Sequence, residues 1–307
     1  MNILIIGNCQ ARPVSSFISA LCPDATMLPE IIVHLESNDN AEKNGECMAN
    51  ADVIFAQLVQ DNYPVSHLAT SNLKNQFPNK VVVWPNAFYV GQSPNIVCLS
   101  KPGLPRVKGP LDVYHITDIL CAWQEALSEN ACIEKIINQS VSVGTVANAC
   151  KFSLDELKQR ELSCDIRISD YIEKNWLSKK LFHVFNHPTN QLLIELSTRL
   201  CAAGKVAVSN ELVPEFWPEA LNRVVPPIFP SVRSTLGFEF ECTNSSKGFS
   251  LEIAENGDVS LGDVTILPIE KLVELFYTAY DLQLNRTDQL TYTPASLDPS
   301  INKAIAA

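Results

Sequence analysis

The residues best suited to chemistry in this chain stand within its first dozen positions. Gly7, Asn8, Cys9 and Gln10 follow directly after an apolar run that predicts a buried strand. In an open α/β sheet, ligands bind in the crevice at the carboxyl ends of the strands. Backbone N–H groups at a helix start favour a thiolate and bind an oxyanion, and carboxamides donate to a developing negative charge. We therefore expect catalytic roles for Asn8, Cys9 and Gln10; the alternative is a tight turn in which Gly7 supplies an unusual backbone angle and Cys9 only packs.

A second polar segment, Asn-His-Pro-Thr, occupies residues 186–189 between a predicted strand and a predicted helix. A histidine just before a helix lies at the positive end of the helix dipole, which disfavours the imidazolium form. Because a general base needs a neutral imidazole near physiological pH, His187 is the candidate base. The alternative is a ring that packs at the entry of the helix, with Asn186 as the cap.

The elements that must position these two segments follow an α/β pattern. Short apolar runs alternate with helical periodicity, which favours a mostly parallel sheet with helices on both faces. A turn-rich stretch over 85–110 is a candidate wall of the site, and His115, expected to open the next helix, is a candidate substrate contact. The pattern predicts strands over 3–6, 31–35, 51–57, 80–84 and 181–185, helices over 13–22, 65–75, 111–140, 151–178 and 188–203, and a loop over 37–46. Ser153, followed three residues later by Glu156, matches the capping box of a helix start within the predicted helix over 151–178.

The C-terminal part of the chain differs in character from the rest. Beyond residue 235 the pattern predicts strands over 238–242 and 249–253, a hairpin turn over 255–258, a helix over 268–282 and a loosely ordered tail from 285. The sequence thus predicts an α/β catalytic domain over 1–235 and a small α+β appendage over 236–307.

The composition excludes several classes of protein. The chain has 307 residues and a formal net charge of -11, from 34 acidic and 23 basic residues, which argues against nucleic-acid binding. No apolar run suits a transmembrane segment or a secretory signal, so a cytoplasmic protein is expected. Ten cysteines are scattered without a Cys-x-x-Cys pair, so we expect free thiols and no metal. The sequence also lacks the phosphate-binding-loop, dinucleotide and Gly-x-Ser-x-Gly motifs, which removes the simplest support for nucleotide hydrolysis and hydride transfer.

Two blocks of sequence resemble the WcbI family of polysaccharide-biosynthesis acetyltransferases. The first is the opening string Ile-Leu-Ile-Ile-Gly-Asn-Cys-Gln over 3–10, and the second runs through 157–161, 165–170 and 181–190. Between them, Trp84-Pro85-Asn86 with Gly91 is similar to the family's Phe-Pro-containing segment. The resemblance spans residues 1–235. One departure bears on the acceptor and on the activity, because Gly91-Gln92-Ser93-Pro94 lacks the histidine of the family's Gly-x-His-Pro pattern.

The resemblance implies a coenzyme A-dependent transfer of an acetyl group to a sugar hydroxyl during capsule or exopolysaccharide assembly. Acetyl-CoA is then the co-substrate, and a sugar or polysaccharide is the acceptor. Carried over by position, Cys9 and His187 are the catalytic residues, with Asn8 and Gln10 beside them. The binding residues expected on this basis are Gly7, Arg12, Trp84 and Tyr89 for the coenzyme, with Arg12 on a phosphate and the two rings as stacking faces, and Asn86, His115 and Asn186 for the acceptor.

The chemistry expected from these assignments is acyl transfer to a carbohydrate hydroxyl. His187 deprotonates the hydroxyl, and amides around Gly7 to Gln10 hold the tetrahedral oxyanion. Cys9 is either an acyl-enzyme nucleophile or a polar lining residue in a direct transfer. Two other functions stay open. The Gly-Asn-Cys string is similar to the Gly-Asp-Ser start of SGNH-type esterases, which indicates a hydrolase, and the third function is non-catalytic binding of a carbohydrate or nucleotide.

Overall fold

The computed structural model describes residues 1–138 and 143–294, and their contacts form two compact units. Unit 1 comprises Met1–Phe88, Leu154–Asn175 and Asn186–Leu221. Unit 2 comprises the described residues of Tyr89–Ser153, Trp176–Phe185 and the chain from Asn222 onward. Each unit is therefore assembled from separate stretches of sequence, and the contiguous division after residue 235 stays a prediction.

Unit 1 is built on a parallel sheet in the strand order β2-β1-β4-β5, with β3 also paired to β1. In β1 (Asn2–Gly7) the four apolar residues from Ile3 to Ile6 are fully buried, as expected for a strand covered on both faces. The predicted α/β class is confirmed. The other strands are β2 (Thr26–Met27), β3 (Ile31–Ile32), β4 (Val53–Gln57) and β5 (Val81–Trp84).

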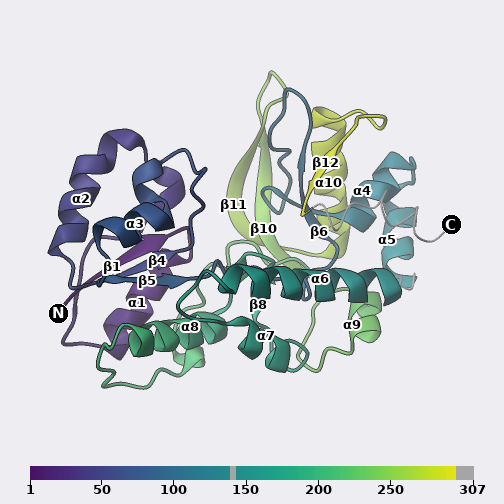
Figure 1. The fold of residues 1–307 in the computed structure, drawn as a ribbon. Coiled ribbons are helices and arrows are strands. Elements are labelled where there is room, and N and C mark those ends of the chain that lie inside the picture. The colour runs from purple at the N-terminus through teal and green to yellow at the C-terminus, as the bar shows by residue number, and fades with distance from the viewer. Residues whose placement is uncertain (139–142, 295–307) are drawn as a thin grey trace. The chain divides into compact units, whose positions relative to one another are not determined.

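Helices cover both faces of this sheet (Figure 1). On one face lie α1 (Ala11–Leu21) and α8 (Asn190–Ala203), which pack against each other, and on the other lie α2 (Ala41–Asn50) and α3 (Thr70–Gln76). The loop predicted over 37–46 is wrong, because α2 begins there. This helix buries only Asn44 and Met48, so its sequence carries little of the apolar periodicity that predicts a helix. The remaining elements of unit 1 are η1 (Val33–Leu35), η2 (Asn38–Asn40), η3 (Ser66–Leu68), α7 (Ser169–Asn175), β9 (His187–Pro188) and η4 (Pro214–Phe216).

Helix α6 (Val143–Glu161) corrects the predicted capping box. Ser153 lies inside this helix rather than at its start. Its hydroxyl instead accepts a hydrogen bond from the backbone N–H of Val90 at 3.1 Å. Ser153 therefore makes a tertiary contact, which the local pattern of a serine and a glutamate three residues apart does not distinguish from a cap. The helix predicted over 151–178 is in fact two, since α6 ends at Glu161 and α7 begins at Ser169.

Unit 2 contains two antiparallel sheets and a helical layer. Its three-stranded sheet has the order β12-β6-β7, and β10 pairs with β11 as a hairpin whose turn contains Gly257 at φ +85°. Helix α10 packs against α4, α5 and this hairpin. The elements are β6 (Ile96–Ser100), β7 (Tyr114–Ile116), α4 (Thr117–Gln124), α5 (Glu129–Asn138), β8 (Phe182–Val184), α9 (Pro230–Leu236), β10 (Ser246–Ile253), β11 (Val259–Leu267), α10 (Ile269–Gln283) and β12 (Thr291–Thr293).

Four predictions for unit 2 are wrong. Within the described residues, the helix expected over 111–140 is strand β7 followed by two helices, α4 and α5. The strand expected over 238–242 is absent from this described segment, although the turn over 255–258 and the helix over 268–282 are confirmed. The tail expected from 285 includes strand β12, which pairs with β6; its residues 295–307 lie outside the described part. His115 lies in strand β7 rather than at a helix start. In the portion of the chain that the structure describes, none of the helices combines the length and apolar composition of a membrane span.

Candidate functional site

The first candidate segment begins where β1 ends beside β4 and β5. Gly7 is buried there, and a Cβ atom built on it would lie 2.9 Å from Cζ2 of Trp84 and 3.3 Å from Cβ of Gln57. Residue 7 must therefore be glycine for the three strand ends to approach this closely. The unusual backbone angle considered for Gly7 is not observed, because the described residues with positive φ do not include it.

The side chain of Gln10 is the centre of a buried hydrogen-bond network. Its Nε2 donates to the carbonyl oxygens of Ala87 (2.9 Å) and Asn186 (3.0 Å) and to Oδ1 of Asn86 (3.0 Å). Its Oε1 accepts from the backbone N–H of Ala87 (3.2 Å) and from Nε2 of Gln57 (3.3 Å). Gln10 is 0% exposed, so its amide is satisfied entirely by the protein. This geometry suits a residue that holds the site together.

Asn8 extends the network along the backbone. Its Oδ1 accepts the backbone N–H of Gln10 at 2.9 Å, and its Nδ2 donates to Oδ1 of Asn86 at 3.2 Å. The backbone N–H of Asn8 donates to Oε1 of Gln57 at 2.9 Å. Two of the backbone N–H groups that were expected to hold an oxyanion are therefore already bonded to side-chain oxygens.

Gln57 is a member of this network that the sequence analysis missed. It is the last residue of β4 and is 5% exposed. The available signal was a carboxamide at the carboxyl end of a strand that is otherwise apolar, in the same sheet as β1. A buried polar side chain at that position needs hydrogen-bond partners, and the neighbouring strand end supplies them.

The two candidate segments meet through Gln10. The hydrogen bond from its Nε2 to the carbonyl oxygen of Asn186 joins residues 176 positions apart, both within unit 1. Asn186 directly precedes His187, and Gln10 directly follows Cys9. The structure thus brings the ends of the two polar segments to one place at the carboxyl end of β1.

His187 lies in the short strand β9, before the start of α8. The helix predicted from residue 188 begins at Asn190, with Thr189 at its N-cap. Oε1 of Glu219 accepts the backbone N–H of Asn190 at 2.6 Å, and the buried Asn190 side chain bonds the carbonyl oxygens of Trp217 and Pro218. These bonds fix the start of α8 and so the path of the chain after the half-buried His187.

The Cys9 side chain is half-buried, and its environment favours the thiol over the thiolate. Burial raises the pKa of Cys9, and the backbone N–H groups of Cys9 and Gln10 oppose this rise by a smaller amount. The helix-start amides therefore act on the sulfur as expected, but desolvation dominates. None of the ten cysteines, all of which lie in the described residues, forms a disulfide bond.

The other predicted binding residues fall in different environments. Arg12 is exposed in the first turn of α1. Trp84 is 0% and Tyr89 is 1% exposed, so neither ring presents an open face for stacking. His115 is 0% exposed in unit 2, where its ring nitrogens contact the Tyr280 hydroxyl and the Val107 carbonyl oxygen, each at 3.1 Å. The structure does not bring His115 into the network around Gln10.

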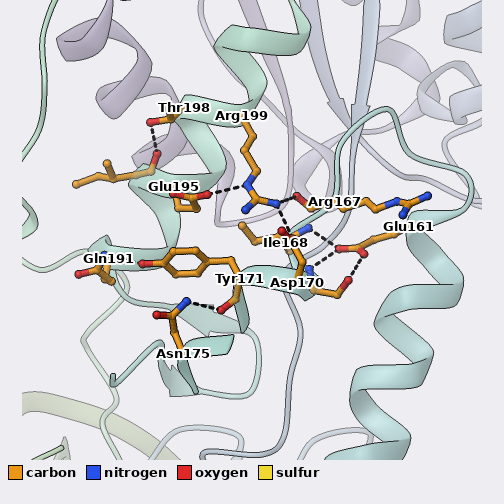
Figure 2. Close-up of polar contacts among 12 residues, drawn as sticks. Glu161, Arg167, Ile168, Asp170, Tyr171, Asn175, Gln191, Glu195, Thr198 and Arg199 are labelled. Carbon is orange, nitrogen blue, oxygen red and sulfur yellow. Dashed lines mark hydrogen bonds and ion pairs between the residues drawn. The ribbon is translucent and has the colours of Figure 1, made fainter. Parts of the chain in front are cut away.

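Glu161 and Asp170 of the second resembling block take part in a polar cluster that orients α7 against α8 (Figure 2). The buried carboxylate of Glu161 accepts the backbone N–H groups of Ile168 (2.6 Å) and Ser169 (2.8 Å) and also the Ser169 hydroxyl. Arg199 of α8 donates to Asp170 (2.6 Å) and to Glu195 (2.7 Å), and its hydrogen bond to Asp170 lowers the pKa of that carboxyl group. These contacts therefore fix the start of α7 and hold it to α8. Among the described residues, no group of three or more His, Cys, Asp and Glu side chains is arranged to hold a metal ion.

Comparison with known proteins assigns the family. The family model of the polysaccharide biosynthesis enzyme WcbI matches residues 2–208. A solved structure of WcbI, described as a novel polysaccharide biosynthesis enzyme in native form without a disulfide bond between coenzyme A and one of its cysteines, shares this fold at 18% sequence identity, with a TM-score of 0.69 over 99% of this chain and 94% of that one. No curated protein matches. Because the family model covers more than half of its length, this chain belongs to the WcbI family of polysaccharide biosynthesis enzymes.

Proposed function

We propose that this chain is a coenzyme A-dependent O-acetyltransferase that transfers an acetyl group from acetyl-CoA to a sugar hydroxyl in capsule or exopolysaccharide assembly. The observation that carries the proposal is the 3.0 Å hydrogen bond between Gln10 and the carbonyl oxygen of Asn186, since it unites a thiol segment with a histidine segment. Membership of a polysaccharide-biosynthesis family and the coenzyme named for the WcbI structure support the choice of substrates. With acetyl-CoA as donor, the reaction would take place in the cytoplasm.

The proposed reaction is a direct transfer with His187 as general base. His187 takes the proton of the sugar hydroxyl while that oxygen attacks the thioester carbonyl. A C–O bond forms, the C–S bond breaks, and the proton passes from His187 to the departing coenzyme sulfur. Burial of Cys9 raises the pKa of its thiol, which favours a lining role over attack by a thiolate. Asn186 is the proposed contact for the acceptor.

The coenzyme would approach along the start of α1. Arg12 is exposed there, and none of the ion pairs between described residues engages it, so its guanidinium is available for a phosphate. The absence of a side chain at Gly7 keeps the strand ends close, and the buried Trp84 packs against it as part of the wall. The buried Tyr89 and His115 are proposed to support the fold rather than to touch substrate.

Binding and turnover assays test this function in separate steps. Acetyl-CoA should raise the Tm of the wild-type protein, and incubation with sugar acceptors should release coenzyme A and add one acetyl group to the acceptor by mass. Release of acetate from a simple ester without coenzyme would instead favour the hydrolase, and absence of binding and turnover would leave the non-catalytic domain.

Variants test the two residues separately. His187→Ala should lower kcat by about 10²–10⁴-fold while retaining acetyl-CoA binding, and Cys9→Ala should retain transfer if the route is direct. An acetylated Cys9 peptide, together with loss of activity in Cys9→Ala, would establish the acyl-enzyme route instead. The exposed His34 provides the matched control, because His34→Ala should behave as wild type. Full turnover in both site variants would remove the assignment.

A further inference from the structure

Backbone groups fix which end of each carboxamide around Gln10 is the oxygen and which is the nitrogen. The side-chain oxygen of Gln10 must face the Ala87 N–H, and its nitrogen must face the carbonyl oxygens of Ala87 and Asn186. The oxygen of Asn8 must face the N–H of Gln10, and the oxygen of Gln57 must face the N–H of Asn8. A flip of any of these three amides would oppose two donors or two acceptors in a buried setting, which costs the desolvation free energy of each unpaired group.

These carboxamides in turn fix the orientation of the Asn86 amide. Its Oδ1 lies 3.2 Å from Nδ2 of Asn8 and 3.0 Å from Nε2 of Gln10, whose two hydrogens are shared among three oxygens. Both neighbours are donors, so the end of the Asn86 amide that faces them is the oxygen. The nitrogen must therefore lie at the other end. Asn86 is half-buried, and within the described chain its Nδ2 makes no hydrogen bond and is not one of the enclosed polar atoms. The network ends in an accessible donor.

Asn86 lies where an acyl transfer would need a hydrogen-bond donor besides the backbone N–H groups. Asn86 lies two residues after the end of β5, at the same carboxyl edge of the sheet as Cys9, two residues after the end of β1. The N–H groups of Asn8 and Gln10 are occupied by Oε1 of Gln57 and Oδ1 of Asn8. The N–H of Cys9 is directed at its own sulfur, so an acyl transfer at this edge needs a further donor for the oxygen that gains negative charge.

We propose that Nδ2 of Asn86 donates a hydrogen bond to the acyl oxygen of the donor substrate and stabilises the oxyanion of the tetrahedral intermediate. Asn86 is then a catalytic residue, whereas Gln10, Asn8 and Gln57 are positioning residues that orient its amide. The donor forms no covalent bond and transfers no proton: the acceptor oxygen adds to the carbonyl carbon, the C–S bond breaks, and the hydroxyl proton ends on the coenzyme sulfur. This inference rests on the proposed acyl transfer.

The variant Asn86→Asp tests the donor with little change of shape. One carboxylate oxygen can still accept from Asn8 and Gln10, while the other replaces the donor by an acceptor. We expect kcat to fall by about 10²–10³-fold at pH 8, the usual effect of losing one oxyanion donor, with acetyl-CoA binding and Tm retained. A protonated carboxyl group can donate again, so the ratio of variant to wild-type activity should rise as the pH is lowered. Asn75→Asp, on the exposed surface of α3, is the matched control and should match wild type at every pH.

The outcomes separate this inference from the proposed function. If the wild type transfers acetyl groups and Asn86→Asp does so at the same rate, or if the activity ratio is independent of pH, the donor role is overturned. If Asn86→Asp fails to fold, Asn86→Ala replaces it and should show the same loss of kcat without the pH-dependent recovery. If the wild type neither binds nor uses acetyl-CoA, the transferase fails, and hydrolysis of p-nitrophenyl acetate becomes the readout. Loss of that hydrolysis in Asn86→Asp would support the donor; unchanged hydrolysis, or none in the wild type, would contradict it.

Discussion

At the scale of single residues, the candidate site contains two kinds of carboxamide: one that is accessible, and others that are buried and orient it. Gln10 was expected to be catalytic from its neighbours in sequence, yet its amide is fully buried and fully bonded. Asn86, which follows another strand, carries the open donor of the same network. The chemistry of a carboxamide was thus predictable from the sequence, but which one faces the substrate depends on contacts between segments far apart in the chain.

Replacing Gln10 should destabilise unit 1. In Gln10→Met the side-chain volume is kept, but the N–H and carbonyl of Ala87, the carbonyl of Asn186 and the amides of Asn86 and Gln57 lose a partner. Buried groups left unpaired cost about 1–3 kcal/mol each, with incomplete additivity, so we expect a loss of about 3 kcal/mol or more in urea unfolding. Gln159→Met, at an exposed position of α6, should change stability little. An equal effect of both substitutions would contradict the network.

At the scale of elements, α8 and α7 position the histidine segment. Helix α8 begins three residues after His187, and the contacts of Asn190 with Trp217 and Pro218 fix its first turn. Helix α7 has no acceptor of its own for its first N–H groups, and Glu161 of α6 supplies one from outside. Glu161, Ile168 and Ser169, which belong to the block that resembles a family motif, therefore contribute through the packing of helices.

The Glu161 contact can be tested by truncation. Glu161→Ala removes the acceptor for the N–H groups of Ile168 and Ser169 and for the Ser169 hydroxyl. Because the carboxylate is buried at a helix N-terminus, we expect a loss of about 3 kcal/mol in the free energy of unfolding. Glu161→Gln keeps an oxygen acceptor and should lose less. Glu156→Ala, one turn earlier on the exposed side of α6, is the control. If Glu156→Ala lowers the free energy of unfolding as much as Glu161→Ala does, the loss comes from changes within α6 and not from the contact with the start of α7.

At the scale of the whole molecule, the sequence predicts what local patterns determine. The buried run of β1 and the alternation of strands and helices gave the parallel sheet correctly. Features that depend on distant partners were not predictable from local pattern: α2 is polar, β12 gains its pairing from β6, and Gln57 gains its role from Asn8. The histidine in β7 shows the same limit, since its surroundings come from α10, about 165 residues later along the chain.

Burial of His115 makes the stability of the chain depend on pH. Its ring is enclosed by Phe276 and Tyr280, and desolvation lowers its pKa to about 4, against a smaller opposing effect of the Val107 carbonyl. The unfolded chain, with an ordinary histidine pKa near 6.5, therefore binds more protons between these values than the folded chain does. The stability that the neutral, buried His115 ring gives is complete above pH 6.5 and is lost as the pH falls towards 4, by roughly 2 kcal/mol at pH 5.

Urea unfolding at pH 8 and pH 5 measures this loss when wild type is compared with His115→Gln. The variant should be less stable than wild type at pH 8, but its free energy of unfolding should fall less on acidification. His34→Gln, at an exposed position, should keep the wild-type difference. Equal losses in wild type and His115→Gln would show that the acid sensitivity comes from other groups.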